Sequence, residues 1–195
     1  MSRTYLPILF TCALAALAAP GPDPIATVTG GQIEGRANAS GAMFRGIPYA
    51  APPVGDLRWK EPMPVKPWTG VRDAIDYGAT CAQMDAGWNK LDAQNGSEDC
   101  LFLNIWTNEW PPKTPKPVMV WIHGGANMGG SAGSGVGSRA LFDGTRIASH
   151  GVVLVTLNYR LGLLGFFAHP ELTAESPHHA SGNYGTPTTC SAVAR

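Results

Sequence analysis

Residues 117–130 read P-V-M-V-W-I-H-G-G-A-N-M-G-G, an apolar run that leads into a glycine-rich loop. The run Val118–Ile122 is long enough for a buried strand. After His123 the chain enters the loop, where glycine predominates. Because glycine has no Cβ, such a loop lets a ligand approach backbone N–H groups that no neighbouring strand pairs. N–H groups of this kind can stabilise an anion that forms during a reaction.

A second apolar run predicts the neighbouring strand. Residues 152–159, V-V-L-V-T-L-N-Y, form the most hydrophobic β-branched stretch of the chain. Strands that are apolar on both faces belong to sheets that are covered on both sides. Between the two runs, residues 140–150 have modest helical spacing, weakened by Gly144. Strand, helix and strand in this order predict a βαβ unit, and therefore an α/β fold.

The chain before residue 117 has the pattern of short strands and extended connectors. Glycine turns separate three β-prone pieces, at residues 25–29, 32–36 and 42–45. Small antiparallel strands are the natural interpretation. Prolines and glycines recur through residues 44–59, so we expect neither regular helix nor a central strand there. Residues 61–79 read as an extended connector anchored by Trp68, and residues 101–106 as a β-rich apolar run.

Composition and charge restrict the class of protein. The 195 residues are 44% hydrophobic and 14% charged, which fits one globular domain or part of a larger one. Fourteen basic and fourteen acidic residues are mixed along the chain. Without a basic patch, the sequence indicates neither a nucleic-acid partner nor an anionic membrane surface.

The first 18 residues have the features of a secretory signal peptide. Arg3 gives a positive start, residues 6–18 are largely apolar, and A-L-A at 16–18 supplies the small residues before a cleavage site. A membrane anchor is the alternative, but about 13 apolar residues are too few for a span of roughly 20. We therefore expect a secreted protein without a transmembrane segment.

Secretion affects how cysteines and asparagines are interpreted. Cys81 and Cys100 enclose a polar loop, and an oxidising compartment favours a disulfide between them. Two buried free thiols are the alternative. Cys190 has no evident partner. Asn38 and Asn95 begin the sequons N-A-S and N-G-S, which predict glycosylation in exposed loops.

Several motifs occur together in one order along the chain. They are F-R-G-I-P-Y-A at 44–50, P-P-V-G at 52–55, L-R-W at 57–59, E-D-C-L-F-L-N at 98–104, H-G-G-A at 123–126, N-Y-R-L-G at 158–162, G-F at 165–166 and S-G-N-Y-G at 181–185. Together they resemble the type-B carboxylesterase family, which includes the cholinesterases. The resemblance implies a partial α/β-hydrolase fold, in which small antiparallel N-terminal strands lead into a mixed, mainly parallel sheet. Residues 19–185 would form the N-terminal part of that domain, and residues 186–195 a divergent tail.

The resemblance also assigns a role to the glycine loop. It implies an oxyanion hole in which Gly125 and Ala126 donate backbone N–H groups, with Gly124 in the same loop. Each preorganised donor is worth roughly 3–4 kcal/mol in the transition state. The sequence departs from the family at Ala126, where glycine is common, and at Asn127, where an aromatic residue is usual. Alanine has the same backbone N–H as glycine, so the oxyanion hole is retained if the loop keeps the same backbone conformation.

Further roles follow from the resemblance. Cys81 and Cys100 look like the first disulfide of the family, and Arg58 and Glu98 like a structural ion pair, with plain surface charge as the alternative for Glu98. Trp88 is similar to the tryptophan of the cholinesterase choline site, where a quaternary ammonium sits on the ring face. A packed anchor of the disulfide loop is the alternative for Trp88.

A serine nucleophile on a strand-to-helix elbow, G-x-S-x-G, is required for this chemistry. The pattern occurs at residues 129–133, G-G-S-A-G, but loop residues separate it from the strand that ends at Ile122. A glycine- and serine-rich stretch of low helix propensity follows Ser131. We therefore interpret Ser131 as a chance match. His123 is interpreted as structural, and the other histidines match no metal pattern, so we expect neither a metal nor a cofactor.

The resemblance implies a secreted serine carboxylic-ester hydrolase that acts on small-molecule esters. The chain reads as its N-terminal fragment, inactive alone because the nucleophile, acid and base are absent. A truncated product, an alternative transcript or a gene-model error would each explain this. The alternative function is a non-catalytic cholinesterase-like adhesion or interaction protein. In the fragment, we expect the strand at residues 152–159 to lack a neighbour on one side, which exposes an apolar edge.

Overall fold

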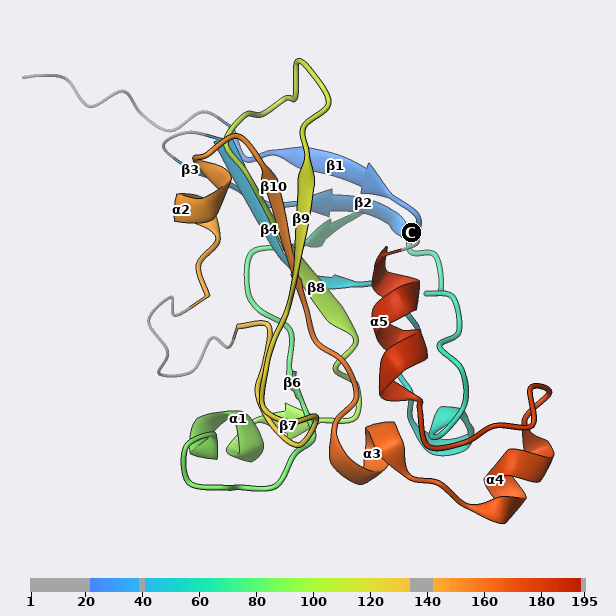
Figure 1. Ribbon diagram of the computed structural model, residues 1–195. Helices are drawn as coiled ribbons and strands as arrows, with labels where there is room; N and C mark the ends of the chain where they lie inside the picture. The colour runs from blue at the N-terminus through green and yellow to red at the C-terminus, as the bar shows by residue number, and fades with distance from the viewer. Residues whose placement is uncertain (1–21, 39–40, 134–141, 194–195) are drawn as a thin grey trace, which may run out of the picture.

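The computed structural model describes residues 22–38, 41–133 and 142–193 (Figure 1). The predicted signal peptide lies outside these residues, so secretion stays a prediction. Across the described ranges, no helix combines the length and the apolar character needed to cross a membrane.

A mixed five-stranded sheet forms the centre, with strand order β3-β4-β8-β10-β9. Its strands are β3 (Arg36–Asn38), β4 (Gly41–Pro48), β8 (Phe102–Thr107), β9 (Val118–Ile122) and β10 (Val153–Leu157). β9 and β10 run parallel and are connected through α2 (Thr145–Ala148), so the predicted βαβ unit is confirmed. β8 pairs antiparallel with β10 and with β4.

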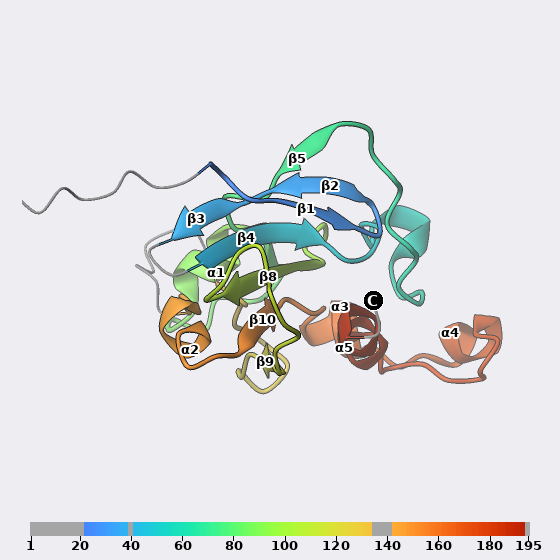
Figure 2. The same ribbon diagram turned by 90° about the horizontal axis from the view of Figure 1, so that it is seen from above.

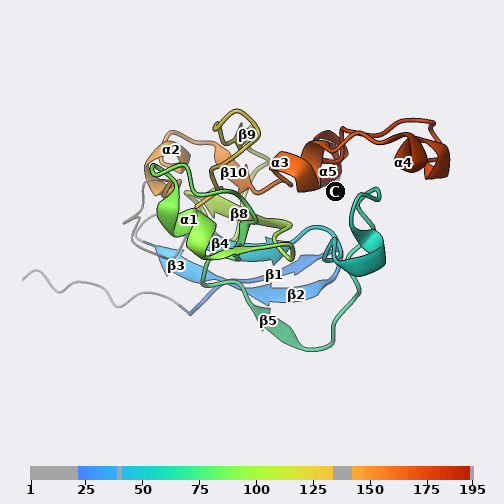
Figure 3. The ribbon, with the colours of Figure 1, turned by 90° about the horizontal axis from the view of Figure 1, so that it is seen from below.

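A smaller sheet packs against β4 of the central sheet. It has the order β1-β2-β5, built from β1 (Ile25–Val28), β2 (Gly31–Glu34) and β5 (Val71–Asp73). β1 and β2 pair antiparallel, as predicted. Trp68 anchors the connector before β5, because its Nε1–H donates to the Gln32 carbonyl oxygen at 2.9 Å. Seen from below, this sheet lies on the side away from α1, α2 and α3 (Figure 3).

The remaining elements are short. They are η1 (Gly55–Leu57), β6 (Thr80–Cys81), α1 (Lys90–Gln94), β7 (Gly96–Ser97), α3 (Gly162–Phe166), α4 (Pro170–Glu175) and α5 (Gly185–Val193). β6 and β7 pair with each other inside the segment that Cys81 and Cys100 bound. α5 passes through residues that the sequence analysis treated as a divergent tail.

Helices cover both faces of the central sheet. On one face, Trp106 and Leu154 pack with Ala148 of α2. On the other, Leu157 belongs to a cluster against which Ala192 of α5 packs. Figures 1 and 2 show α2 and α5 on opposite sides of β8 and β10. The core therefore lies on both faces of the sheet, as strands with apolar residues on both faces require.

The predicted position of the open strand was wrong. β10, within residues 152–159, has β8 on one side and β9 on the other, so it is an interior strand. The edge strands in the described part of the sheet are β3 and β9. The pattern predicts that both apolar strands are buried; this is confirmed for β10 and wrong for β9, none of whose residues is fully buried. The pattern does not contain the order in which β8, β9 and β10 pair.

The prediction that residues 44–59 contain no central strand was also wrong. β4 runs to Pro48 and lies between β3 and β8. A bulge between Phe44 and Ile47 accommodates Gly46, whose φ is 64°. The bulge absorbs the glycine, and the proline stands at the last position of the strand, so neither residue interrupts the ladder.

Candidate active site

The loop after β9 turns sharply through three residues with positive φ. Gly125, Ala126 and Asn127 have φ angles of 123°, 54° and 60°. The N–H groups of Met128 and Gly129 both donate to the Gly125 carbonyl oxygen, at 2.9 and 3.2 Å, which closes the turn. Left-handed backbone is unfavourable for alanine and asparagine, so contacts around the loop must maintain it.

This turn leaves two backbone donors available. The N–H groups of Gly125 and Ala126 make no hydrogen bond within the described ranges. A Cβ at Gly125 would lie 1.9 Å from the carbonyl oxygen of Gly129, so only glycine fits there. Unpaired successive N–H groups form a concavity that suits an anion. The two donors are those that the family resemblance implies.

The residues that follow β10 hold one side of the loop. The Tyr159 hydroxyl donates to the His123 carbonyl oxygen at 3.1 Å and lies 3.3 Å from Asn127 Oδ1. The Gly162 N–H donates to the Asn127 carbonyl oxygen at 2.7 Å. Burial raises the pKa of Tyr159, so its hydroxyl stays protonated and able to donate at neutral pH.

His123 is a buried, neutral side chain at the start of the loop. Its ring stacks on Tyr159 with 4.5 Å between centroids, and its Nδ1 lies 3.0 Å from the Gly124 carbonyl oxygen. Burial lowers the pKa of His123, which favours the uncharged imidazole. These contacts fit the structural role predicted for His123.

Ser131 is buried in the same loop. Its hydroxyl donates to Asp92 Oδ1 at 3.3 Å. A nucleophile elbow follows a strand directly, whereas β9 ends at Ile122 and loop residues lead to Ser131. The position of Ser131 therefore does not match that of a nucleophile.

The disulfide loop lies beside the glycine loop (Figure 1). Cys81 and Cys100 are bonded to each other. Trp88, within the loop that they close, is 65% exposed. A Cβ at Gly125 would lie 3.2 Å from Cη2 of Trp88, so the edge of the indole reaches the turn. Trp88 thus borders the two donors instead of being buried inside its own loop.

Ala126 is one of the residues that line a groove of about 720 Å³. Its lining is mainly apolar and contains no charged side chain; the lining residues are Ala82, Gln83, Met84, Ala126, Asn127, Met128, Leu161, Gly162, Leu163, Leu164 and Phe166. The residue that bears one of the two free N–H groups, Ala126, therefore lines a mainly apolar groove. Such a surface suits an uncharged ligand group next to an anion.

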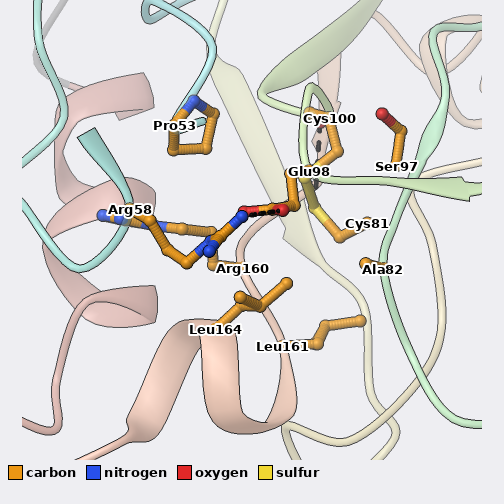
Figure 4. A pocket seen from close by; sticks show the side chains of 10 residues that line it. All are labelled: Pro53, Arg58, Cys81, Ala82, Ser97, Glu98, Cys100, Arg160, Leu161 and Leu164. Atoms are coloured by element: carbon orange, nitrogen blue, oxygen red, sulfur yellow. Dashed lines mark hydrogen bonds and ion pairs between the residues drawn. A yellow bond between two sulfur atoms is a disulfide. The ribbon is translucent and has the colours of Figure 1, made fainter. Parts of the chain in front are cut away.

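Arg58 and Glu98 form an ion pair close to the disulfide (Figure 4). Arg58 donates from Nε to Oε2 and from Nη2 to Oε1, both at 2.5 Å. The hydrogen bond from Arg58 holds the pKa of Glu98 below its usual value. This bidentate pair joins the connector after β4 to the disulfide loop.

Arg160, from the N-Y-R-L-G motif, is buried and connects α5 to the sheet. Its Nε donates to Thr188 Oγ1 at 3.1 Å, and its Nη2 to the Tyr184 carbonyl oxygen at 3.0 Å. Burial lowers the pKa of Arg160 to about 10, so the guanidinium is still charged at neutral pH. Arg160 therefore positions a helix, and this role is separate from that of the two N–H groups in the glycine loop.

The sequons differ in exposure. Asn38 ends β3 and is half-buried, whereas Asn95 follows α1 and is exposed. Glycosylation at both stays a prediction. No cluster of three or more potential metal-ligating side chains is found in the described ranges.

The residues that hold the loop in place could not be predicted from the sequence. Tyr159 was part of a recognised motif, but nothing in the motif indicated its contact with His123. Gln83 and Asn89 lie in a polar loop without periodicity, and both contact the loop or its neighbours. No local sequence pattern predicts these contacts, because the partners are far apart along the chain: Gln83 is hydrogen-bonded to a residue 47 positions away.

Comparison with known proteins places these features in a family context. The model of the carboxylesterase family matches residues 22–193. The chain is 42% identical over 191 residues to the fumonisin B1 esterase of Sphingopyxis macrogoltabida, covering 95% of this chain and 34% of that protein. It is 44% identical over 147 residues to the para-nitrobenzyl esterase of Bacillus subtilis strain 168, covering 73% and 28%.

Comparison with solved structures also finds esterases. A para-nitrobenzyl esterase structure superposes with a TM-score of 0.75 at 37% identity, over 89% of this chain and 34% of that one. The carboxylesterase EST55 of Geobacillus stearothermophilus gives 0.72 at 36% identity, over 87% and 33%. These structures share the α/β-hydrolase fold with the chain. The chain spans about a third of the length of the relatives that it matches.

Proposed function

Because the chain belongs to the carboxylesterase family, we propose that it is the N-terminal part of a serine carboxylic-ester hydrolase and supplies the oxyanion hole. The observation that carries the proposal is the turn at Gly125 and Ala126, whose N–H groups make no hydrogen bond within the described ranges. These donors would bind the carbonyl oxygen of an ester as it becomes negatively charged.

The chemistry proceeds by acyl transfer. A serine hydroxyl adds to the ester carbonyl while a base takes its proton, and the carbonyl electron pair moves onto the oxygen held by the loop. The C–O bond to the alcohol then breaks, and the alcohol leaves with that proton. Water repeats the sequence on the acyl-enzyme, which releases the acid and restores the serine. In our proposal, the serine, its base and its acid come from residues outside these 195.

The groove supports esters with an uncharged, apolar group. Ala126 lines it, and no charged side chain does. The names of two relatives, para-nitrobenzyl esterase and fumonisin B1 esterase, are consistent with small-molecule esters. The exposed ring of Trp88 beside the turn supports a choline ester as the alternative substrate.

A serine-reactive fluorophosphonate tests where the nucleophile lies. We expect the purified 195-residue chain to hydrolyse no p-nitrophenyl acetate and to take up no probe, with a full-length esterase as the positive control. Ser131 is buried and bonded to Asp92, which supports this expectation. Mass spectrometry that locates the probe on Ser131 would contradict it.

The same probe tests the function when the chain is expressed with its genomic continuation. We expect hydrolysis of p-nitrophenyl esters and labelling of a serine beyond residue 195. A continuation without G-x-S-x-G, and without hydrolysis, would overturn the proposal and favour the non-catalytic adhesion or interaction protein. Secretion is tested on the same material: we propose a mature N-terminus at Ala19 and a glycan on the exposed Asn95.

A further inference from the structure

The side chain of Gln83 joins the disulfide loop to the glycine loop. Its Oε1 accepts a hydrogen bond from the Gly130 N–H at 2.8 Å, and its Nε2 donates to the Gly130 carbonyl oxygen at 3.0 Å. One side-chain amide thus satisfies both polar groups of a backbone residue, as a neighbouring strand would. Nε2 also donates to the Cys81 carbonyl oxygen at 2.9 Å, beside the disulfide.

Asn89 fixes the orientation of the Gln83 amide. Asn89 is buried, and its Nδ2 donates to Gln83 Oε1 at 2.9 Å and to the Met84 carbonyl oxygen at 2.8 Å. Its Oδ1 accepts from the Ala86 N–H at 2.7 Å. Every polar atom of the two amides therefore has a partner, and only one arrangement of oxygen and nitrogen satisfies them all.

The contact is close to the turn that bears the two donors. Gly129 precedes Gly130, and its N–H closes the turn on the Gly125 carbonyl oxygen. A Cβ at Gly129 would lie 2.8 Å from Asn89 Nδ2 and 3.1 Å from Gln83 Oε1. Fixing Gly130 therefore fixes the far end of a turn whose near end is Gly125.

We propose that Gln83 is a positioning residue, which acts through Gly130 to keep the turn in the conformation that frees the Gly125 and Ala126 N–H groups. Within the described ranges, Gln83 makes no hydrogen bond to either of the two donors. Its importance for catalysis rests on the proposed function, whereas its hold on the turn does not depend on any reaction.

Amide hydrogen exchange measured by NMR on the 195-residue chain tests the proposal. The variant Gln83→Met keeps the side-chain length and removes its hydrogen bonds. The reporters are the amides of Met128 and Gly129, which bond to Gly125 and not to Gln83. Loss of the two hydrogen bonds to Gly130 should accelerate exchange at both reporter amides by at least about tenfold. Amides of β10 should exchange as in the wild type.

The matched control is Gln94→Met, an exposed glutamine of α1 within the same disulfide loop, which should leave the reporters unchanged. A second variant, Gln83→Glu, keeps the acceptor but turns a carboxylate oxygen toward two carbonyl oxygens, and it should also accelerate exchange at Met128 and Gly129. If Gln83→Met does not fold, this variant decides by the same criterion.

Unchanged exchange at Met128 and Gly129 in a folded Gln83 variant would overturn the inference, even if Gly130 itself exchanges faster. The outcome is separable from that of the proposed function. Accelerated exchange in a protein without hydrolase activity would overturn only the function. Normal exchange in a protein with an active continuation would overturn only the role of Gln83.

Discussion

Two adjacent glycines in the loop after β9 differ in whether a side chain could replace their hydrogen. A Cβ at Gly124 would meet no heavy atom within 4 Å, whereas one at Gly125 would lie 1.9 Å from the Gly129 carbonyl oxygen. Gly125 also has a φ of 123°, which alanine rarely adopts. Gly125, the proposed donor, is therefore the glycine of the pair that tolerates no side chain.

We expect Gly125→Ala to lower the free energy of unfolding by about 1–3 kcal/mol, because the turn must open to relieve the clash and the backbone strain. Gly124→Ala is the matched control and should change it by less than about 0.5 kcal/mol. Urea unfolding followed by tryptophan fluorescence measures both. Equal effects of the two substitutions would contradict the geometry of the turn.

The Arg58–Glu98 pair predicts a pH dependence of stability. Hydrogen bonding to Arg58 lowers the pKa of Glu98 in the folded state. A carboxylate of this kind stabilises the fold above its unfolded pKa, and the contribution is lost as pH falls through the folded pKa. We expect thermal unfolding between pH 3 and 7 to show a loss of stability below about pH 4.5 that is smaller in Glu98→Gln.

The control for this pair is Asp99→Asn. Asp99 is exposed next to Glu98, and its side chain makes no ion pair within the described ranges. Its replacement should leave the acid limb of the stability profile as it is in the wild type. A Glu98→Gln profile parallel to that of the wild type would show that the pair contributes nothing measurable, as many exposed pairs do.

The free N–H groups of Gly125 and Ala126 were predictable from residue types, whereas the residues that contact the loop were not. H-G-G-A after an apolar run predicts unpaired N–H groups because glycine permits that backbone. The contact of Gln83 with Gly130 depends on a loop that folds back over 47 positions, and no periodicity records it. Tyr159 shows the same limit, since its hydroxyl reaches the His123 carbonyl oxygen from the segment after β10.

At the scale of elements, strands could be predicted but their neighbours could not. β9 and β10 coincide with the two apolar runs. Burial on both faces explains the continuous hydrophobic pattern of β10, whereas β9 has the same pattern but no fully buried residue. The first half of β4 was predicted, at residues 42–45, but its continuation to Pro48 was missed because Gly46 is absorbed in a bulge, a feature that depends on pairing with β8. The order of β8, β10 and β9 is a property of pairing across long separations, which the residue pattern does not contain.

The disulfide loop is the element whose stability depends most on one covalent link. It contains α1 and β7 but no large apolar core. We expect the double variant Cys81→Ser/Cys100→Ser to lower the free energy of unfolding by about 3 kcal/mol, from the entropy of the opened loop. Urea denaturation measures this loss. Wild-type protein in dithiothreitol should behave in the same way, and insensitivity of both would contradict the prediction.

At the scale of the whole molecule, the open edge of β9 exposes apolar side chains. Val118 is 62% exposed, and Met119 is 48% exposed. An apolar strand with an unpaired edge tends to associate with other chains. We expect the 195-residue chain to self-associate with rising concentration, and Met119→Lys to reduce this association, as measured by sedimentation velocity.

Met63→Lys is the matched control for this prediction. Met63 is also 48% exposed, but it lies in the connector between η1 and β5 and not at the edge of the central sheet. It adds the same charge to the molecule, so it separates a general effect of charge from an effect at the edge. Equal reduction by both variants would show that β9 is not the associating surface.

The position of β10 between β8 and β9 has a consequence for the assembly of the chain on the ribosome. Synthesis produces β4, β8 and β9 before β10, so the antiparallel β4–β8 pair can form early. β8 and β9 have no bridge to each other until β10 emerges and inserts between them. During that interval the nascent chain exposes the unpaired edges of both β8 and β9, the kind of surface that makes folding intermediates prone to aggregate.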